Sequence, residues 1–199
     1  MATIGLSKPY YAIYSATGST VTYSKGGLMG KYTELDISLD SQDANILYAD
    51  NAAAESDQQF TGGTATITTD DLRPETTVAV LGATEETITD EGITTTEPKW
   101  LVFDDDQEAP YVGVGGIIKK KADGAIKWVA FVLNKVQFTT PGISAVTQGE
   151  TIEWQTQALT ATIMRSDAAK HPWFRMSTPM DSEADAEAAI KKYLSIAKS

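Results

Sequence analysis

The sequence offers few side chains with the types and spacing that catalysis requires. Its single histidine, His171, precedes Pro172 and Trp173, and the chain contains no cysteine. A histidine in a connecting segment, without a thiol, does not supply a nucleophile–base pair of the usual kind. With 27 acidic residues some suitable carboxylate pair is inevitable, so such a pair is no evidence of hydrolysis. We therefore predict no enzyme, no catalytic residues and no cofactor.

The acidic run at residues 104–108 (DDDQE) is the nearest approach to a metal site. A helix–loop–helix calcium loop places a glycine sixth and a glutamate twelfth. Counted from Asp104, those positions hold Ala109 and Gly115. We therefore predict a solvated acidic turn and no metal site.

Two further runs invite a nucleotide-binding interpretation. The glycines at 113–116 (GVGG) lack the dinucleotide spacing and are followed by strand residues rather than a helix. They are more typical of positions where a backbone or a bulky side chain packs closely. The lysines at 119–121 lie at the end of an expected hairpin. A solvated tip or a contact with an acidic neighbour is favoured there over nucleic-acid binding.

Composition restricts the partners. The chain has 199 residues, which suits one domain, and a formal net charge of -11. Such a charge repels phosphate backbones and anionic lipid, so specific DNA or RNA binding and membrane binding are disfavoured. No apolar run approaches the roughly 20 residues that span a bilayer. Residues 1–11 lack a signal-peptide pattern, so we expect folding in the cytoplasm that made the chain.

The elements that would position any site are mainly strands. Threonine is β-branched and polar, which favours strands with one face in water. The expected strands occupy 31–40, 60–70, 111–121, 126–138 and 150–164, with a possible strand pair in 84–98. Both faces of 126–138 are apolar, so this strand should lie inside a sandwich or beneath a helix or a neighbouring subunit.

Two helices complete the expected fold. A short one should be capped by Asp70 or Asp71 and end at Gly82, and an alanine-rich one should occupy 181–199. We predict a mainly β fold of two packed antiparallel sheets, as a sandwich or barrel, in one domain spanning 1–199. Residues 1–180 would form the sandwich, with an N-terminal arm and a long loop at 42–59.

The clearest alternation predicts a strand with one acidic face. Leu35, Ile37 and Leu39 alternate with the polar residues Glu34, Asp36, Ser38 and Asp40. A period of two places the apolar set inward and the acidic set outward.

Several segments then carry a resemblance. They are Ile4-Gly5-Leu6 with Tyr10 and Tyr14, LYADN at 47–51, AESD at 54–57, FTGGT at 60–64, TDDL at 69–72, APYVGVG at 109–115 with Lys119-Lys120, and QGETIEWQT at 148–156. Together, in this order over most of the chain, they resemble the major tail protein, or tail-tube subunit, family of long-tailed bacteriophages.

The resemblance implies a structural virion protein, assembled in the host cytoplasm and located in the tail. It implies six-fold rings stacked into a hollow tube, with loops and terminal arms reaching the next ring. Expected partners are further copies of the chain and the tape measure, tail-tip and tail-terminator proteins. DNA would pass through without specific binding. The candidates for lining the lumen are Glu34, Asp36, Asp40 and Glu153, and those for inter-subunit loop contacts are Leu47, Tyr48 and Asp50.

Two alternatives remain open. A monomeric β-sandwich module that binds carbohydrate or protein would share the threonine-rich strands and exposed aromatics such as Trp100 and Trp173. A tube subunit of a phage-tail-like bacteriocin would share nearly everything with a phage tail subunit.

Overall fold

The computed structural model describes residues 2–41, 45–49, 52–57, 59–87, 99–122, 124–142, 147 and 156–197. Its strands are β1 (Ala2–Thr17), β2 (Thr20–Leu28), β3 (Tyr32–Ser41), β4 (Asn45–Ala49), β5 (Ala52–Asp57), β6 (Phe60–Thr69), β7 (Thr84–Thr87), β8 (Lys99–Val102), β9 (Tyr111–Ala122), β10 (Ala125–Phe138), β11 (Gln157–Ile163) and β12 (Phe174–Met176). Its helices are α1 (Pro74–Leu81) and α2 (Glu183–Tyr193). The prediction of a mainly β fold with one short internal and one C-terminal helix is confirmed.

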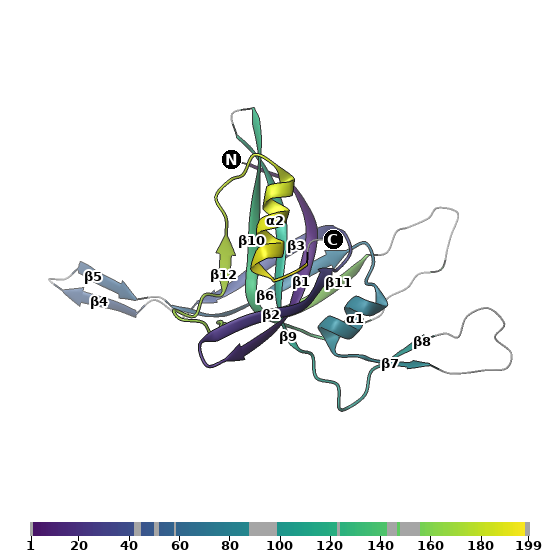
Figure 1. Ribbon diagram of the computed structural model, residues 1–199. Helices are drawn as coiled ribbons and strands as arrows, with labels where there is room; N and C mark the ends of the chain where they lie inside the picture. Colours follow the sequence, from purple (N-terminus) through teal and green to yellow (C-terminus); the bar gives the residue numbers. More distant parts are fainter. Residues whose placement is uncertain are drawn as a thin grey trace.

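One antiparallel sheet forms the body (Figure 1). Its strand order is β2-β1-β9-β10-β11-β6-β3. β12 pairs with residues 131–133 of β10, on the side away from β9, where β11 pairs with residues 136–138. The sheet curves so that β3 comes into contact with β1, and the Tyr32 hydroxyl donates to the Gly115 carbonyl at 3.4 Å. The two layers of the sandwich are therefore two halves of one hydrogen-bonded sheet.

Apolar side chains fill both sides of the half formed by β1, β9 and β10. The inner cluster, enclosed by the curved sheet, includes Met29, Ile67, Leu81, Val112, Val114, Leu133, Val136, Leu159 and Ile163. The outer cluster, between this half and α2, comprises Tyr10, Ala12, Ile117, Ala130, Val132, Ala186, Ile190 and Leu194. β10 is thus buried on both faces, as its sequence predicts. A bulge between Leu133 and Val136 keeps both of these side chains in the inner cluster.

The glycines of β9 allow neighbouring groups to approach the strand. A Cβ at Gly115 would lie 2.8 Å from Cγ2 of Ile190, on α2. At Gly116 it would lie 2.7 Å from atoms of both Phe131 and Tyr32. The predicted close-packing role of this run is confirmed.

The short helix α1 ends as expected but begins differently. Gly82 has φ 71° and its N–H donates to the Val78 carbonyl at 3.1 Å, a left-handed stop that glycine tolerates. The predicted aspartate cap is wrong, because the helix starts after Arg73 with no side-chain cap. Asp70 instead accepts the Lys31 backbone N–H at 2.7 Å, which joins β6 to the start of β3.

The C-terminal helix is shorter than the predicted 181–199. Ser182 caps it, accepting the Asp185 N–H at 3.1 Å. It ends at Tyr193, because Ser195 adopts a left-handed φ of 53° and the Ile196 N–H returns to the Lys191 carbonyl at 2.8 Å. Leu194 and Ile196 still pack on the outer cluster, so the apolar stripe that predicted more helix continues into this turn.

Other boundaries also differ from expectation. The predicted N-terminal arm is instead strand β1, which pairs with β9 from Ala2 onward. The predicted loop at 42–59 contains the paired strands β4 and β5. β7 pairs with β8, which begins at Lys99, just after the expected 84–98 segment. β11 occupies 157–163 of the predicted 150–164 strand, and residues 150–155 lie outside the described part of the chain. In the part of the chain that the structure describes, no helix has the length and apolarity of a membrane span.

Candidate assembly surfaces

One half of the sheet has a polar outer face. On β3, Leu35 and Ile37 pack against the inner cluster, whereas Glu34, Asp36, Ser38 and Asp40 are exposed on the other face. The predicted alternation is confirmed over these residues, although Leu39, at the end of the pattern, is 48% exposed.

Threonines extend this face across the neighbouring strands. Asp36 lies opposite Thr66 of β6, which in turn lies opposite Thr160 of β11. We call the outward, accessible positions of the three strands the acidic face: Glu34, Asp36, Ser38, Asp40, Thr64, Thr66, Ala158, Thr160 and Thr162. None of these positions holds an aromatic or basic residue.

The structure brings together three of the four predicted lumen-lining residues, since Glu34, Asp36 and Asp40 share one strand face. The fourth, Glu153, lies outside the described residues. The threonines of β6 and β11 were not among the predicted site residues. The alternating runs TATIT at 64–68 and TATI at 160–163 were the signal that could have identified them.

Two hairpin ribbons project from the body (Figure 1). β4 pairs with β5, and β7 pairs with β8. Leu47 and Tyr48, two predicted contact residues, belong to β4, and their side chains lie outside what the structure describes, as does Asp50 altogether. A two-stranded ribbon that packs on nothing is marginal in water, so both ribbons are candidate contact elements.

An ionic cluster holds α2 on β1. Glu187 accepts hydrogen bonds from Lys8 and, at 2.6 Å, from the Tyr10 hydroxyl, and Lys191 lies 2.9 Å from the same carboxylate. The hydrogen bond from Lys8, followed by that from Tyr10, lowers the pKa of Glu187 to about 2. The Ser7 hydroxyl adds a bond to Glu183 at 2.7 Å. These contacts fix the helix over the outer cluster.

His171 belongs to a second polar cluster. Its Nδ1 lies 2.9 Å from the Ser166 carbonyl. Nearby, Asp167 accepts bonds from Lys135 and Tyr14, each at 2.8 Å. The bond from Lys135 is the main cause of the lowered pKa of Asp167. These interactions tie the segment after β11 to β1 and β10.

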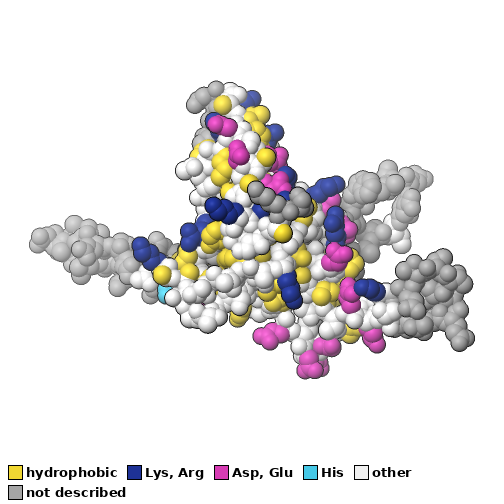
Figure 2. All heavy atoms as spheres, in the orientation of Figure 1, with side chains coloured by type: hydrophobic (Ala, Val, Ile, Leu, Met, Phe, Trp, Pro, Cys, Tyr) yellow, Lys and Arg dark blue, Asp and Glu magenta, His cyan; other side chains and the backbone are white. Residues whose placement is uncertain are grey.

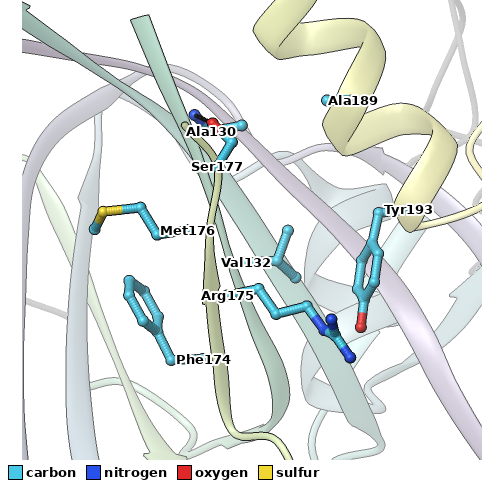
Figure 3. A pocket seen from close by; sticks show the side chains of 8 residues that line it. All are labelled: Ala130, Val132, Phe174, Arg175, Met176, Ser177, Ala189 and Tyr193. Carbon is cyan, nitrogen blue, oxygen red and sulfur yellow. Dashed lines mark hydrogen bonds between the residues drawn. The ribbon is translucent and has the colours of Figure 1, made fainter. Parts of the chain in front are cut away.

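A shallow groove of about 450 Å³ separates α2 from β12 (Figure 3). Val132 lies at its floor, and Arg175 points across it toward the Tyr193 ring, whose centroid is 5.3 Å from the guanidinium carbon. Ser177 bonds the Ala130 N–H at 2.9 Å. Among the described residues that line the groove, Arg175 is the only charged one. Its guanidinium could hold an anionic group.

No cluster of three or more histidine, cysteine, aspartate or glutamate side chains suited to a metal occurs among the described residues. The sequence matches no protein-family model and no curated protein.

Proposed function

We propose that the chain is a structural subunit that assembles with copies of itself into the hollow tail tube of a long-tailed bacteriophage. In this proposal, six copies form a ring, rings stack into a tube, and DNA passes through the lumen. The protein would belong to the virion tail and be assembled in the host cytoplasm. Its other partners would be the tape measure, tail-tip and tail-terminator proteins that the resemblance implies.

The observation that most supports the proposal is the acidic face. A channel for DNA must present groups that neither stack on bases nor clamp phosphates. Glu34, Asp36 and Asp40 repel phosphates, and at physiological salt their field reaches about 8 Å into solution. The threonine hydroxyls beside them add a hydrated, uncharged surface. We therefore assign the acidic face to the lumen wall, and the half covered by α2 to the outside.

The open sheet supports self-assembly. Within the described part of the chain, β3 pairs only with β6 and β2 only with β1, so no described strand covers the other edge of β2 or of β3 between Tyr32 and Asp40. Exposed edges promote association unless they are covered. Pairing with neighbouring subunits in a ring would complete them, and the two projecting ribbons would contact further copies.

Negative-stain electron microscopy of concentrated protein, with small-angle scattering of a dilute sample, tests the proposal. We expect rings or hollow tubes on concentration, and a dilute monomer. A compact domain of this size has a radius of gyration of about 16 Å, and the ribbons should increase it. If the protein stays monomeric at high concentration and also fails to polymerise on purified tail tips, the proposal is wrong.

The groove beside Arg175 favours one alternative, a monomeric module that binds a protein or carbohydrate. Of the aromatic residues expected to bind sugar, Trp173 stacks on Phe60 at 4.4 Å and is half-buried, whereas Trp100 is 55% exposed. A module of this kind stays monomeric in the same experiment and binds glycans on an array. A bacteriocin tube subunit would assemble in the same way. Whether the native tubes co-purify with packaged DNA distinguishes the two, because a bacteriocin tube passes no genome.

A further inference from the structure

The two ends of the body carry opposite charges. β9 (Tyr111–Ala122) begins just after the acidic turn and ends in the lysines at 119–121. At about 3.3 Å per residue, the stretch of β9 from Tyr111 to Lys120 separates the two charged groups by roughly 30 Å. In the orientation of Figure 1, Figure 2 shows acidic side chains at the lower end of the body, and basic side chains together with some acidic ones near the upper tip.

The upper end, which we call the basic tip, consists of Ile4, Lys119, Lys120, Lys121 and Ile126. Lys120 lies directly opposite Lys127 in the ladder, an arrangement of like charges that destabilises a strand pair. Lys127 is neutralised by Asp181, but lysines 119–121 have no carboxylate partner among the described residues. Ile4 is 49% exposed and Ile126 40% exposed beside them.

The lower end, which we call the acidic turn, consists of Phe103, Asp104, Asp105, Asp106 and Glu108. Its four carboxylates are exposed and form no ion pair with described residues. Two hydrogen bonds order the turn. The Asp104 side chain accepts the Asp106 N–H at 3.1 Å, and the Gln107 side-chain amide donates to the Leu81 carbonyl of α1 at 2.6 Å. Phe103, beside the carboxylates, is 46% exposed.

The two ends complement each other in charge and in apolar surface. We propose that the basic tip of one copy docks on the acidic turn of a second copy, head to tail. The contact brings unpartnered lysines to unpartnered carboxylates and covers Ile4 and Ile126 with Phe103. Because it joins two different surfaces at opposite ends of the same chain, it propagates into a linear stack when successive copies are not related by a closing rotation. The inference rests on the proposed function and names the surfaces that would join successive rings.

A second copy suits the tip better than a nucleic acid does. The lysines are few, the nearby Lys127 is already paired with Asp181, and the whole chain has a net charge of -11. Association with DNA through a basic surface requires many phosphate contacts at physiological salt. The exposed isoleucines also have no role in binding phosphates.

Charge exchange between the two ends tests the contact. The variant K119E/K120E/K121E gives an acidic tip, and D104K/D105K/D106K gives a basic turn. Each alone should raise the concentration needed for assembly at least about tenfold, measured by light scattering and sedimentation velocity, since several exposed ion pairs become repulsions. A mixture of the two variants should assemble, because each supplies the end that the other needs. The chain that combines all six substitutions should assemble alone.

The matched control is R73E/K170E/K192E, which changes the net charge equally at exposed basic residues outside the tip and outside the edge strands β2 and β3, and should assemble like the wild type. Circular dichroism verifies folding, and K119Q/K120Q/K121Q replaces the glutamate variant if that one unfolds. Wild-type tubes that tolerate both reversals overturn the head-to-tail contact but leave the proposed function standing. A wild-type protein that never assembles overturns both. If the wild type retards duplex DNA in a gel mobility shift and the glutamine variant does not, the basic tip binds nucleic acid and the proposed head-to-tail contact is wrong.

Discussion

At the scale of single residues, the end of α2 depends on a side chain in an unfavourable conformation. Ser195 adopts φ 53°, where its Cβ is crowded, and it occupies the position that glycine usually takes after a helix. Its conformation is maintained by the Ile196 N–H bond to Lys191 and by the packing of Ile196. The residue therefore stores strain.

We expect Ser195→Gly to raise the free energy of unfolding by about 0.5–1 kcal/mol, because relief of the strain exceeds the added freedom of the unfolded chain. Urea denaturation of both proteins measures this difference in the free energy of unfolding. The control is Ser182→Ala at the other end of α2, which removes the cap and should lower stability by about 1 kcal/mol. Equal stability of Ser195→Gly and the wild type would contradict this account.

Glu187 links stability to pH. Its folded pKa of about 2 lies below the ordinary 4.5, so its contribution is complete above the ordinary value and is lost as pH falls toward 2. Glu187→Gln should cost roughly 1–2 kcal/mol at pH 7, since it replaces charged hydrogen bonds with neutral ones.

The measurement is the unfolding free energy of both proteins between pH 7 and pH 2. The difference between wild type and Glu187→Gln should shrink below about pH 4.5 and vanish near pH 2, as the carboxylate is protonated. A difference that stays constant over this range would show that the loss comes from packing. The exposed Glu75→Gln serves as the control and should change little.

At the scale of elements, the inner face of β9 has no room for a Cβ atom at Gly116. A methyl group at Gly116 would collide with Phe131 and Tyr32 at 2.7 Å. We expect Gly116→Ala to destabilise the protein by about 1–3 kcal/mol through overpacking, measured by thermal and chemical denaturation. Gly142→Ala is the matched control, since nothing lies within 4 Å of a Cβ there. Similar stability of both variants would mean that the aromatic rings move aside freely.

The acidic face makes a prediction for the assembled tube. E34K/D36K/D40K changes only outward side chains of β3, so it should leave the inner cluster unchanged but make the lumen attract phosphates. Tubes of this variant should retain a short fluorescent DNA duplex at low salt and release it at high salt. Tubes of wild type and of the control D71K/E75K, at exposed carboxylates outside the acidic face and the ribbons, should release it at both. Equal retention by all three would remove the acidic face from the lumen.

How far the sequence predicts these elements depends on how local each signal is. The alternation of Leu35 and Ile37 with acids is a property of neighbouring residues, and so is the Gly82 stop; both predictions are confirmed. The prediction of an aspartate cap for α1 was wrong, because Asp70 instead accepts a hydrogen bond from the backbone of Lys31, which is distant in the sequence. The groove was not foreseen, since Arg175 and Tyr193 come from separate elements and only the tertiary fold brings them together. The identity of the lumen wall remains a prediction.

At the scale of the whole molecule, stability should be uneven. β9 and β10 are central and buried, whereas β4 and β5 pair only with each other among the described strands. In dilute protein we expect fast amide exchange over 45–57 and slow exchange over β9 and β10, as seen by hydrogen–deuterium exchange with mass spectrometry. On assembly, protection should appear in 45–57. Fast exchange there in mature tubes would exclude the β4–β5 ribbon from the subunit contacts.

The position of β1 in the sheet has a consequence for synthesis. β1 can pair at once with β2, but its other neighbour, β9, follows about 100 residues later, which at ribosomal speeds of about 5–20 residues per second is a delay of some 5–20 s. During that interval the nascent hairpin exposes Tyr10, Tyr11 and Ala12, which are buried in the finished protein. When several ribosomes translate this chain close together, the exposed hairpins can associate with one another. The speed of translation between β1 and β9, or the binding of a chaperone to the hairpin, should therefore determine how much of the protein folds instead of aggregating.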